Sequence, residues 1–271
     1  MTGPLPKSLS NLLLTRTLAT RGLYECRTDI AKFISRCVRD DHGNLLGLAP
    51  MHLYWLQHVE WCWARGLRCM ILAHFGSGKS SALAVPLIAF MLGQDPQLRV
   101  KQICNDDSSA KRRVGSAKQI FESENFRVAF PDARPGPKWT DHELILVRKG
   151  HSIEPSLHAR GVFTTGIGGR ADRIVCDDVV DQKNSMDEAQ RKKVRSLLEE
   201  TWFSRLEPDG QVLWIGTVWN LADATHHFMK QPGWCVLVQK ISDDCNLIEQ
   251  EVVVGPEHRP AYPIELKALA G

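Results

Sequence analysis

The segment between residues 69 and 91 constrains the fold of this chain more than any other part of the sequence. Residues 69–73 form a short apolar run typical of a buried strand, and a turn with two glycines, Gly76 and Gly78, follows it. A helical pattern then runs from Lys79 to about Met91. A strand, a glycine-rich turn and a helix in this order are typical of α/β proteins whose turn backbone binds an anion.

The turn itself carries a nearly complete phosphate-loop pattern, G-x-x-x-x-G-K-[ST]. Residues 73–80 read Ala-His-Phe-Gly-Ser-Gly-Lys-Ser, so only the first position departs, with Ala73 in place of glycine. Backbone N–H groups at the start of the helix favour binding of a phosphate group. The lysine is expected to reach the β- and γ-phosphates of a nucleotide, and the first serine hydroxyl is expected to bind Mg²⁺. Ser81 is a less favoured substitute for that serine. The predicted nucleotide-binding residues are Gly76, Ser77, Gly78, Lys79, Ser80 and Ser81.

Two adjacent carboxylates follow an apolar run about a hundred residues later. Residues 174–178 read Ile-Val-Cys-Asp-Asp, and ligands of open α/β sheets bind at the carboxyl ends of the strands. Asp177 is predicted to hold Mg²⁺ through water, and Asp178 to orient or deprotonate an attacking water. Many ATPases have Glu at the second position, and Asp is shorter by one methylene group.

A third polar position follows another buried run. Residues 213–220 read Leu-Trp-Ile-Gly-Thr-Val-Trp-Asn, which predicts a strand ending in Gly-Thr. Thr217 is then placed to present its hydroxyl and amide beside a γ-phosphate. On its own this pattern is weak, because an ordinary strand-to-loop turn also explains it.

Composition excludes several classes of protein. The 271 residues are 43% hydrophobic and 24% charged, with a net charge of only +3, so the chain is neither disordered, nor a coiled coil, nor a basic coat for nucleic acid. It has no apolar run of membrane-spanning length and no signal-peptide pattern, so we expect a cytoplasmic protein with no membrane partner. The eight cysteines form no CxxC pair and no zinc-finger pattern, so we expect structural thiols.

Elsewhere the chain alternates strand-like and helical patterns. Such alternation predicts right-handed crossovers around a mostly parallel sheet flanked by helices, the α/β fold class. Strands are predicted at residues 69–73, 98–104, 143–148, 156–162, 173–176, 211–216 and 234–240, and helices at 30–38, 51–64, 79–91, 108–123, 186–204 and 223–229.

These three polar segments, in this order, resemble the ATPase domain of the large terminase subunit of tailed phages and herpesviruses. Members of that family carry a variant phosphate loop, a block G-x-R-[AS]-D-x-hhh-D-[DE] and a block h-G-T-x-W. Here the second block spans residues 168–178 and the third spans 215–220. The resemblance covers about residues 25–265, and it departs from the family at Ala73 and in lacking an arginine at the start of the loop.

The resemblance implies a RecA-like (ASCE) P-loop NTPase that uses ATP and Mg²⁺ to drive double-stranded DNA into a viral procapsid in the host cytoplasm. It further implies a portal protein and a small terminase subunit as partners, and self-association into a ring that is pentameric on the portal. The implied organisation is an N-terminal helical segment over residues 1–48, an ATPase core over 49–242 and a linker over 243–271 toward a C-terminal nuclease. We therefore expect no nuclease activity from this chain.

The family also suggests residues that the patterns alone do not. The stretch from Pro50 to Gln57 resembles the family segment near the adenine, which makes Gln57 a candidate adenine contact. Arg170 and Arg160 are candidates for an arginine finger inserted into a neighbouring subunit, with Arg170 slightly favoured. Two basic helical stretches are candidate DNA contacts, although an ion-paired solvated surface explains them at least as well: residues 111–113 with Lys118, and 191–193 with Arg195.

Three other functions stay open on the sequence. The first is a helicase or another RecA-like nucleic-acid translocase, which needs a second domain of the same kind. The second is a small-molecule or nucleoside kinase, although two adjacent carboxylates at a strand end suit hydrolysis better. The third is a scaffold that binds nucleotide without turning it over.

Overall fold

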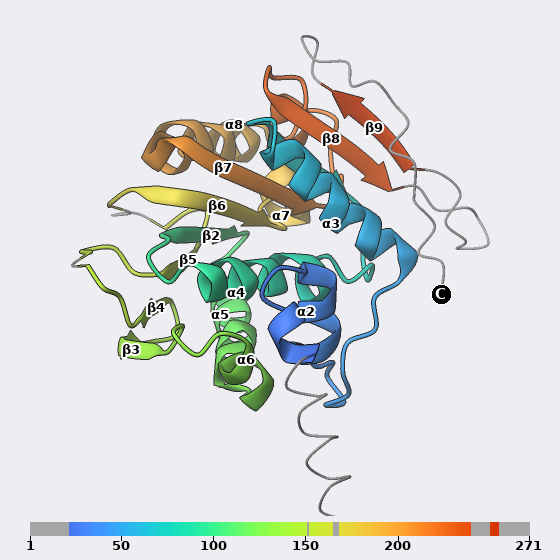
Figure 1. Cartoon of the computed structure of the whole chain (residues 1–271). Coiled ribbons are helices and arrows are strands. Elements are labelled where there is room, and N and C mark those ends of the chain that lie inside the picture. Colours follow the sequence, from blue (N-terminus) through green and yellow to red (C-terminus); the bar gives the residue numbers. More distant parts are fainter. Residues whose placement is uncertain (1–21, 151, 165–167, 240–249, 255–271) are drawn as a thin grey trace, which may run out of the picture.

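The computed structural model describes residues 22–150, 152–164, 168–239 and 250–254. These residues form one nine-stranded sheet with the strand order β3-β4-β5-β2-β6-β7-β1-β8-β9 (Figure 1). The strands from β5 to β8 in that order run parallel, and the outer pairs are antiparallel. The predicted α/β class with a mostly parallel sheet is confirmed. The strands are β1 (Arg68–Leu72), β2 (Val100–Cys104), β3 (Pro135–Trp139), β4 (Glu143–Leu146), β5 (Leu157–Gly161), β6 (Ala171–Asp177), β7 (Leu206–Gly216), β8 (Trp234–Gln239) and β9 (Gln250–Val254).

Helices cover both faces of the sheet (Figure 1). One face carries α2 (Ile30–Cys37), α3 (Pro50–Trp63), α4 (Val85–Gln94), α5 (Asp107–Glu122) and α6 (Glu124–Ala129), and the other carries α7 (Gln182–Ser185), α8 (Glu188–Ser196) and α9 (Ala224–Phe228). The described helices include none that is both long and apolar enough to cross a lipid bilayer.

The alternation of side chains along each strand creates two separate cores. In β1, Cys69 and Ile71 pack against the helices of the first face, whereas Met70 and Leu72 pack on the second. A strand buried on both faces reads as a continuous apolar run, as expected for a parallel sheet covered by helices on both sides. The same two-sided burial explains why the central strands were predictable from sequence.

The prediction of one continuous helix over residues 186–204 is wrong. The α-helix α8 stops at Ser196, a π-helical segment follows over Leu197–Trp202, and a 3₁₀ turn over Phe203–Arg205 leads into β7. Trp202 is fully buried and its indole N–H donates to Val162 O at 3.3 Å. The wider turn places this large side chain in the core, which the helical pattern of the sequence does not reveal.

Two edge strands and one short helix escaped the sequence prediction. Strand β3 contains Pro135 and Pro137, which hide a strand pattern but are tolerated at the edge of a sheet. Strand β9 pairs antiparallel with β8, so the sheet continues beyond residue 242, where we expected the core to end and a linker to begin. The rest of that expected linker, residues 240–249 and 255–271, lies outside the described residues. Helix α6 is also additional to the prediction.

The N-terminal helical segment packs on the core where it is described, from residue 22 onward. The fully buried Phe33 of α2 lies with its ring centroid 5.5 Å from that of Phe90 in α4. The rings of Phe126 and Phe130, in and directly after α6, lie at 6.1 and 5.8 Å in edge-on arrangements. This aromatic cluster joins the segment to two helices of the first face.

Replacing Phe33 by alanine should therefore detach this segment from the core. We expect Phe33→Ala to lower the free energy of unfolding by about 3–5 kcal/mol, because it leaves a cavity among aromatic rings. Urea denaturation followed by circular dichroism measures the change. Ile153→Ala is the control, since that side chain is 99% exposed and should change stability by less than about 0.5 kcal/mol. A loss of less than about 1 kcal/mol for Phe33→Ala would contradict the packing.

Candidate nucleotide-binding site

Three parallel strands bring the predicted segments together at one edge of the sheet. Strand β7 lies between β6 and β1 and pairs parallel with both, so the carboxyl ends of all three strands meet. The loop over residues 73–80 follows β1, Asp177 ends β6, and Thr217 follows β7. The sequence analysis expected each of these segments at the carboxyl end of a strand, where open α/β sheets bind their ligands.

The loop adopts the left-handed backbone conformation at its two glycines. Gly76 and Gly78 have φ angles of 76° and 79°, which other residues adopt only with strain. Ala73 is not among the residues with positive φ, so the missing glycine at this position requires no unusual backbone. The Ser77 hydroxyl donates to His74 O at 2.8 Å and closes the turn.

Lys79 lies inside the loop and is almost fully buried. Its ammonium donates to the carbonyls of Ala73 and His74 at 3.0 and 2.8 Å, and to Thr217 Oγ1 at 3.1 Å. Burial lowers the pKa of Lys79, and the charges of Asp178 and Asp177 partly offset that shift. The lysine thus links the phosphate loop to the end of β7.

Asp177 is buried and satisfied by three side chains. Its Oδ1 accepts from the Ser80 hydroxyl at 2.7 Å, and its Oδ2 accepts from Arg113 Nε at 2.6 Å and from Gln102 Nε2 at 3.4 Å. Burial lowers the pKa of Arg113, but the charge of Asp177 and the hydrogen bond to it outweigh this effect and raise it overall.

The Ser80 hydroxyl and the Asp177 carboxylate together suit a magnesium ion. The 2.7 Å contact places Asp177 Oδ1 beside the Ser80 hydroxyl, where the carboxylate would hold a serine-bound Mg²⁺ through water. Both are hard oxygen donors of the kind that this ion prefers. The chemistry and spacing of Ser80 and Asp177 therefore fit a shared Mg²⁺.

Asp178 is held in a strained and desolvated position. It is the one non-glycine residue with positive φ in the described chain, at 50°, and its N–H donates to Ile215 O at 3.0 Å. Burial, and then the charge of Asp177, raise the pKa of Asp178, while Lys79 and Arg113 oppose the shift. Backbone strain and a raised carboxyl pKa together are typical of functional positions.

Removing the Asp178 charge should stabilise the fold. Asn tolerates the left-handed region and carries no charge to desolvate, so we expect Asp178→Asn to raise the free energy of unfolding at pH 7 by about 1 kcal/mol. Because the pKa of Asp178 is raised in the folded state, its ionised carboxylate destabilises the wild-type fold. This destabilisation is complete above the folded-state pKa and disappears as the pH falls toward the usual value of 3.8. Urea denaturation at several pH values measures both effects. A less stable variant at pH 7 would contradict them.

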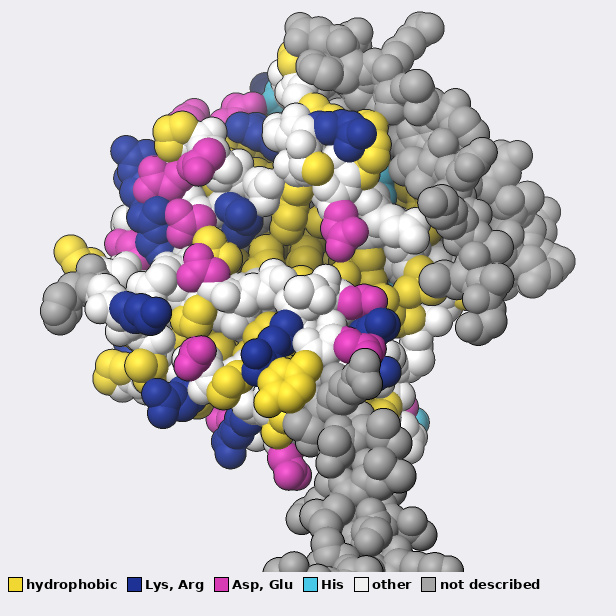
Figure 2. All heavy atoms as spheres, viewed as in Figure 1, with side chains coloured by type: hydrophobic (Ala, Val, Ile, Leu, Met, Phe, Trp, Pro, Cys, Tyr) yellow, Lys and Arg dark blue, Asp and Glu magenta, His cyan; other side chains and the backbone are white. Residues whose placement is uncertain are grey.

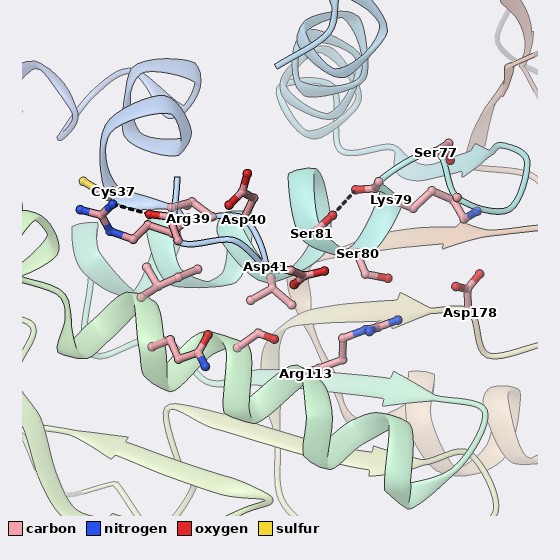
Figure 3. A pocket seen from close by; sticks show the side chains of 18 of the residues that line it. Cys37, Arg39, Asp40, Asp41, Ser77, Lys79, Ser80, Ser81, Arg113 and Asp178 are labelled. Atoms are coloured by element: carbon pink, nitrogen blue, oxygen red, sulfur yellow. Dashed lines mark hydrogen bonds between the residues drawn. The ribbon is translucent and has the colours of Figure 1, made fainter. Parts of the chain in front are cut away.

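A cavity of about 830 Å³ opens beside the loop, within the range of small-ligand sites (Figure 3). Lys79, Ser80, Arg113 and Asp178 lie toward one end of it, and Arg39 and Asp40 lie toward the other. The second group belongs to the N-terminal segment, whose residues between Cys37 and Gly43 form part of the wall. The N-terminal segment thus completes the site.

Two residues of the site escaped the sequence prediction. Arg113 was grouped with the possible DNA contacts, yet it points into the cavity because it flanks Val114, a buried position of α5. His52 of α3 accepts a hydrogen bond from Ala49 N–H at its Nδ1, so its Nε2 carries the proton and donates to Ser77 O at 2.9 Å. Spacing from buried neighbours could have flagged Arg113. No sequence signal indicates the contact of His52.

Three predicted residues lie away from the cavity. Gln57 is exposed on α3, and none of Gln57, Arg160 and Arg170 lines the cavity walls formed by the described residues. Arg160 donates to His158 Nε2 at 3.1 Å and lies 3.7 Å from Glu143. Arg170 is exposed and precedes β6, so it lies about 20 Å from the carboxyl end of that strand.

In both basic stretches, side chains bond to neighbouring groups of the same chain. Arg112 is exposed and donates to Ser108 and Ser109, and Arg191 donates to Ser185 O and Met186 O. Lys192 pairs with Glu188 at 2.6 Å. Figure 2 shows basic and acidic side chains interspersed over the face it presents, which is the pattern of a solvated ion-paired surface.

The Arg113–Asp177 pair should contribute strongly to stability, because removing one partner leaves a buried charge. We expect Arg113→Ala to lower the free energy of unfolding by about 3 kcal/mol, and a second change, Asp177→Asn, to restore most of the loss. Urea denaturation in the absence of Mg²⁺ measures both. Arg112→Ala is the matched control, an exposed arginine one position earlier. Equal effects of Arg112→Ala and Arg113→Ala would contradict the ion pair.

No family model matches the chain, and no curated protein matches its sequence. The large terminase of bacteriophage HK97 superposes with a TM-score of 0.58 and 13% identity, over 83% of this chain and 45% of that one. The fold of this chain is therefore similar to that of a phage large terminase. This chain spans less than half the length of the HK97 protein.

Two further structures align less closely. The ATPase domain of the Thermus phage P74-26 large terminase gives a TM-score of 0.42 with 16% identity, over 69% of this chain and 76% of that one. The S. cerevisiae protein dbp5, solved with nup159, gle1, IP6 and ADP, gives 0.40 with 11% identity, over 73% and 54%. The α/β fold class with a mostly parallel sheet, predicted from the sequence, agrees with the HK97 similarity and with the strand order.

Proposed function

We propose that this chain is the ATP-hydrolysing motor domain of a viral terminase large subunit and drives double-stranded DNA into a procapsid. The observation that carries the proposal is the contact of Ser80 with Asp177 at 2.7 Å, beside Lys79 at the carboxyl edge of a parallel sheet. A phosphate loop and a strand-end carboxylate in contact form the core of a P-loop nucleotide site.

Each residue has a distinct part in hydrolysis. The backbone N–H groups of residues 76–80 and the Lys79 ammonium bind the phosphates, and Ser80 and Asp177 hold Mg²⁺. When bound there, Mg²⁺ would neutralise charge on the phosphate oxygens. Asp178 accepts a proton from the attacking water, for which its raised pKa suits it. Thr217, hydrogen-bonded to Lys79, relays the presence of the γ-phosphate to β7.

The partners follow from the same proposal. Duplex DNA, a portal protein and a small terminase subunit are the expected partners, with the motor acting as a ring, pentameric on the portal, in the host cytoplasm. In that ring Arg170 is available to a neighbouring subunit, because it is exposed and lies away from its own site. Arg160 is less available, since it lies against Glu143 and His158.

Substitutions at the site test the proposal directly. We expect Lys79→Ala to weaken ATP binding and abolish hydrolysis, and Asp178→Asn to keep ATP binding while lowering turnover about 10²–10⁴-fold. Ser80→Ala should lower Mg²⁺-dependent turnover, whereas Ser81→Ala should not, because the Ser81 hydroxyl contacts only Gly78 O, at 3.4 Å, among the described residues. A fluorescent ATP analogue measures affinity, and phosphate release measures turnover.

Two results would contradict the proposal at different levels. Unchanged ATP affinity in Lys79→Ala would mean that this loop does not bind nucleotide. Turnover that responds to single-stranded DNA but not to duplex DNA would retain the ATPase site and overturn the packaging function in favour of a different translocase.

A further inference from the structure

A second polar cluster lies inside the sheet's first face, away from the nucleotide cavity. It contains His58 and Cys62 of α3, Cys69 of β1 and Cys235 of β8, all four fully buried. Figure 1 shows α3 crossing the sheet in the region of β8. The nucleotide site proposed above uses none of these residues.

The ligand atoms of this cluster are spaced as around a single metal ion. His58 Nε2 lies 3.6 Å from Cys62 Sγ and 3.8 Å from Cys235 Sγ, and the three atoms lie within 4.8 Å of one another. In a tetrahedral zinc site with Zn–S about 2.3 Å and Zn–N about 2.0–2.1 Å, neighbouring nitrogen and sulfur atoms are about 3.6 Å apart. We propose that His58, Cys62 and Cys235 bind a zinc ion.

The backbone explains how three distant positions meet. His58 and Cys62 are one helical turn apart, so both face the sheet from α3. Cys235 of β8 packs against the helices of the same face, beside its pairing partner Cys69 in β1.

The chemistry of the cluster suits a soft divalent ion better than an ordinary core. Imidazole and thiolate are the ligands that zinc prefers, in contrast to the oxygen pair of Ser80 and Asp177. The buried His58 side chain makes no hydrogen bond with its Nδ1 in the described residues, and its Nε2 contacts only the two sulfur atoms. A zinc–nitrogen bond at Nε2 would replace these two weak nitrogen–sulfur contacts with one strong bond.

Metal binding here releases protons. Zinc binds cysteine as the thiolate, so each ligating thiol loses its proton to solvent as its sulfur–zinc bond forms. The neutral imidazole binds without losing a proton.

Metal analysis of the intact protein tests the proposal. We expect about one zinc per chain by inductively coupled plasma mass spectrometry, falling at least about tenfold in Cys62→Ala and in His58→Ala. Cys26→Ala is the matched control, because it removes an equally buried thiol that lies against another cysteine, Cys37, with no histidine in that pair. It should retain the metal, as should Asp177→Asn, which separates this site from the magnesium site.

A second measurement keeps the test independent of folding. Cobalt-substituted wild-type protein should show thiolate-to-metal charge-transfer absorption and the visible bands of tetrahedral Co²⁺. Wild-type protein that contains no zinc, and takes up none in competition with a weak chelator, would overturn the proposal. A Cys62–Cys235 disulfide found by mass spectrometry in freshly purified, metal-free protein would also overturn it.

Discussion

The parallel pairing of β6, β7 and β1 determines where the chemistry of this chain lies. Side by side, these strands deliver a phosphate loop, two carboxylates and a threonine to one edge of the sheet. The local features depend on that arrangement. The Ser80 hydroxyl lies 2.7 Å from the Asp177 carboxylate because β1 and β6 are separated by a single strand, β7. Any change in strand order would leave the same residues present and the site absent.

The parts that sequence predicted are those with a strong local signal. The central strands are buried on both faces and read as apolar runs, and the loop carries glycines at two positions with positive φ. The loop, the carboxylates and Thr217 were therefore placed correctly at the strand ends. Edge elements such as β3 and β9 lacked that signal, because an edge strand needs neither continuous hydrophobicity nor a full set of N–H donors.

Contacts between distant elements were not predictable in the same way. Arg113 read as one of several basic residues on a helix, and its ion pair with Asp177 depends on how α5 is turned against the sheet. The sulfur atoms of Cys62 and Cys235 come together through helix packing across 173 positions of sequence, so no short motif marks them. Gln57, suggested by family resemblance, lies on the exposed side of the helix that carries His52.

The hydrogen bond from His52 to Ser77 joins helix α3 to the phosphate loop. In sequence, α3 follows the N-terminal segment, whose residues line the same cavity as the loop. Displacing that segment would therefore change one wall of the cavity. A partner that displaces the N-terminal segment on binding would therefore change the affinity for nucleotide. By thermodynamic reciprocity, nucleotide would change the affinity for that partner by the same factor. In the proposed motor, the cavity would therefore couple subunit assembly to nucleotide binding.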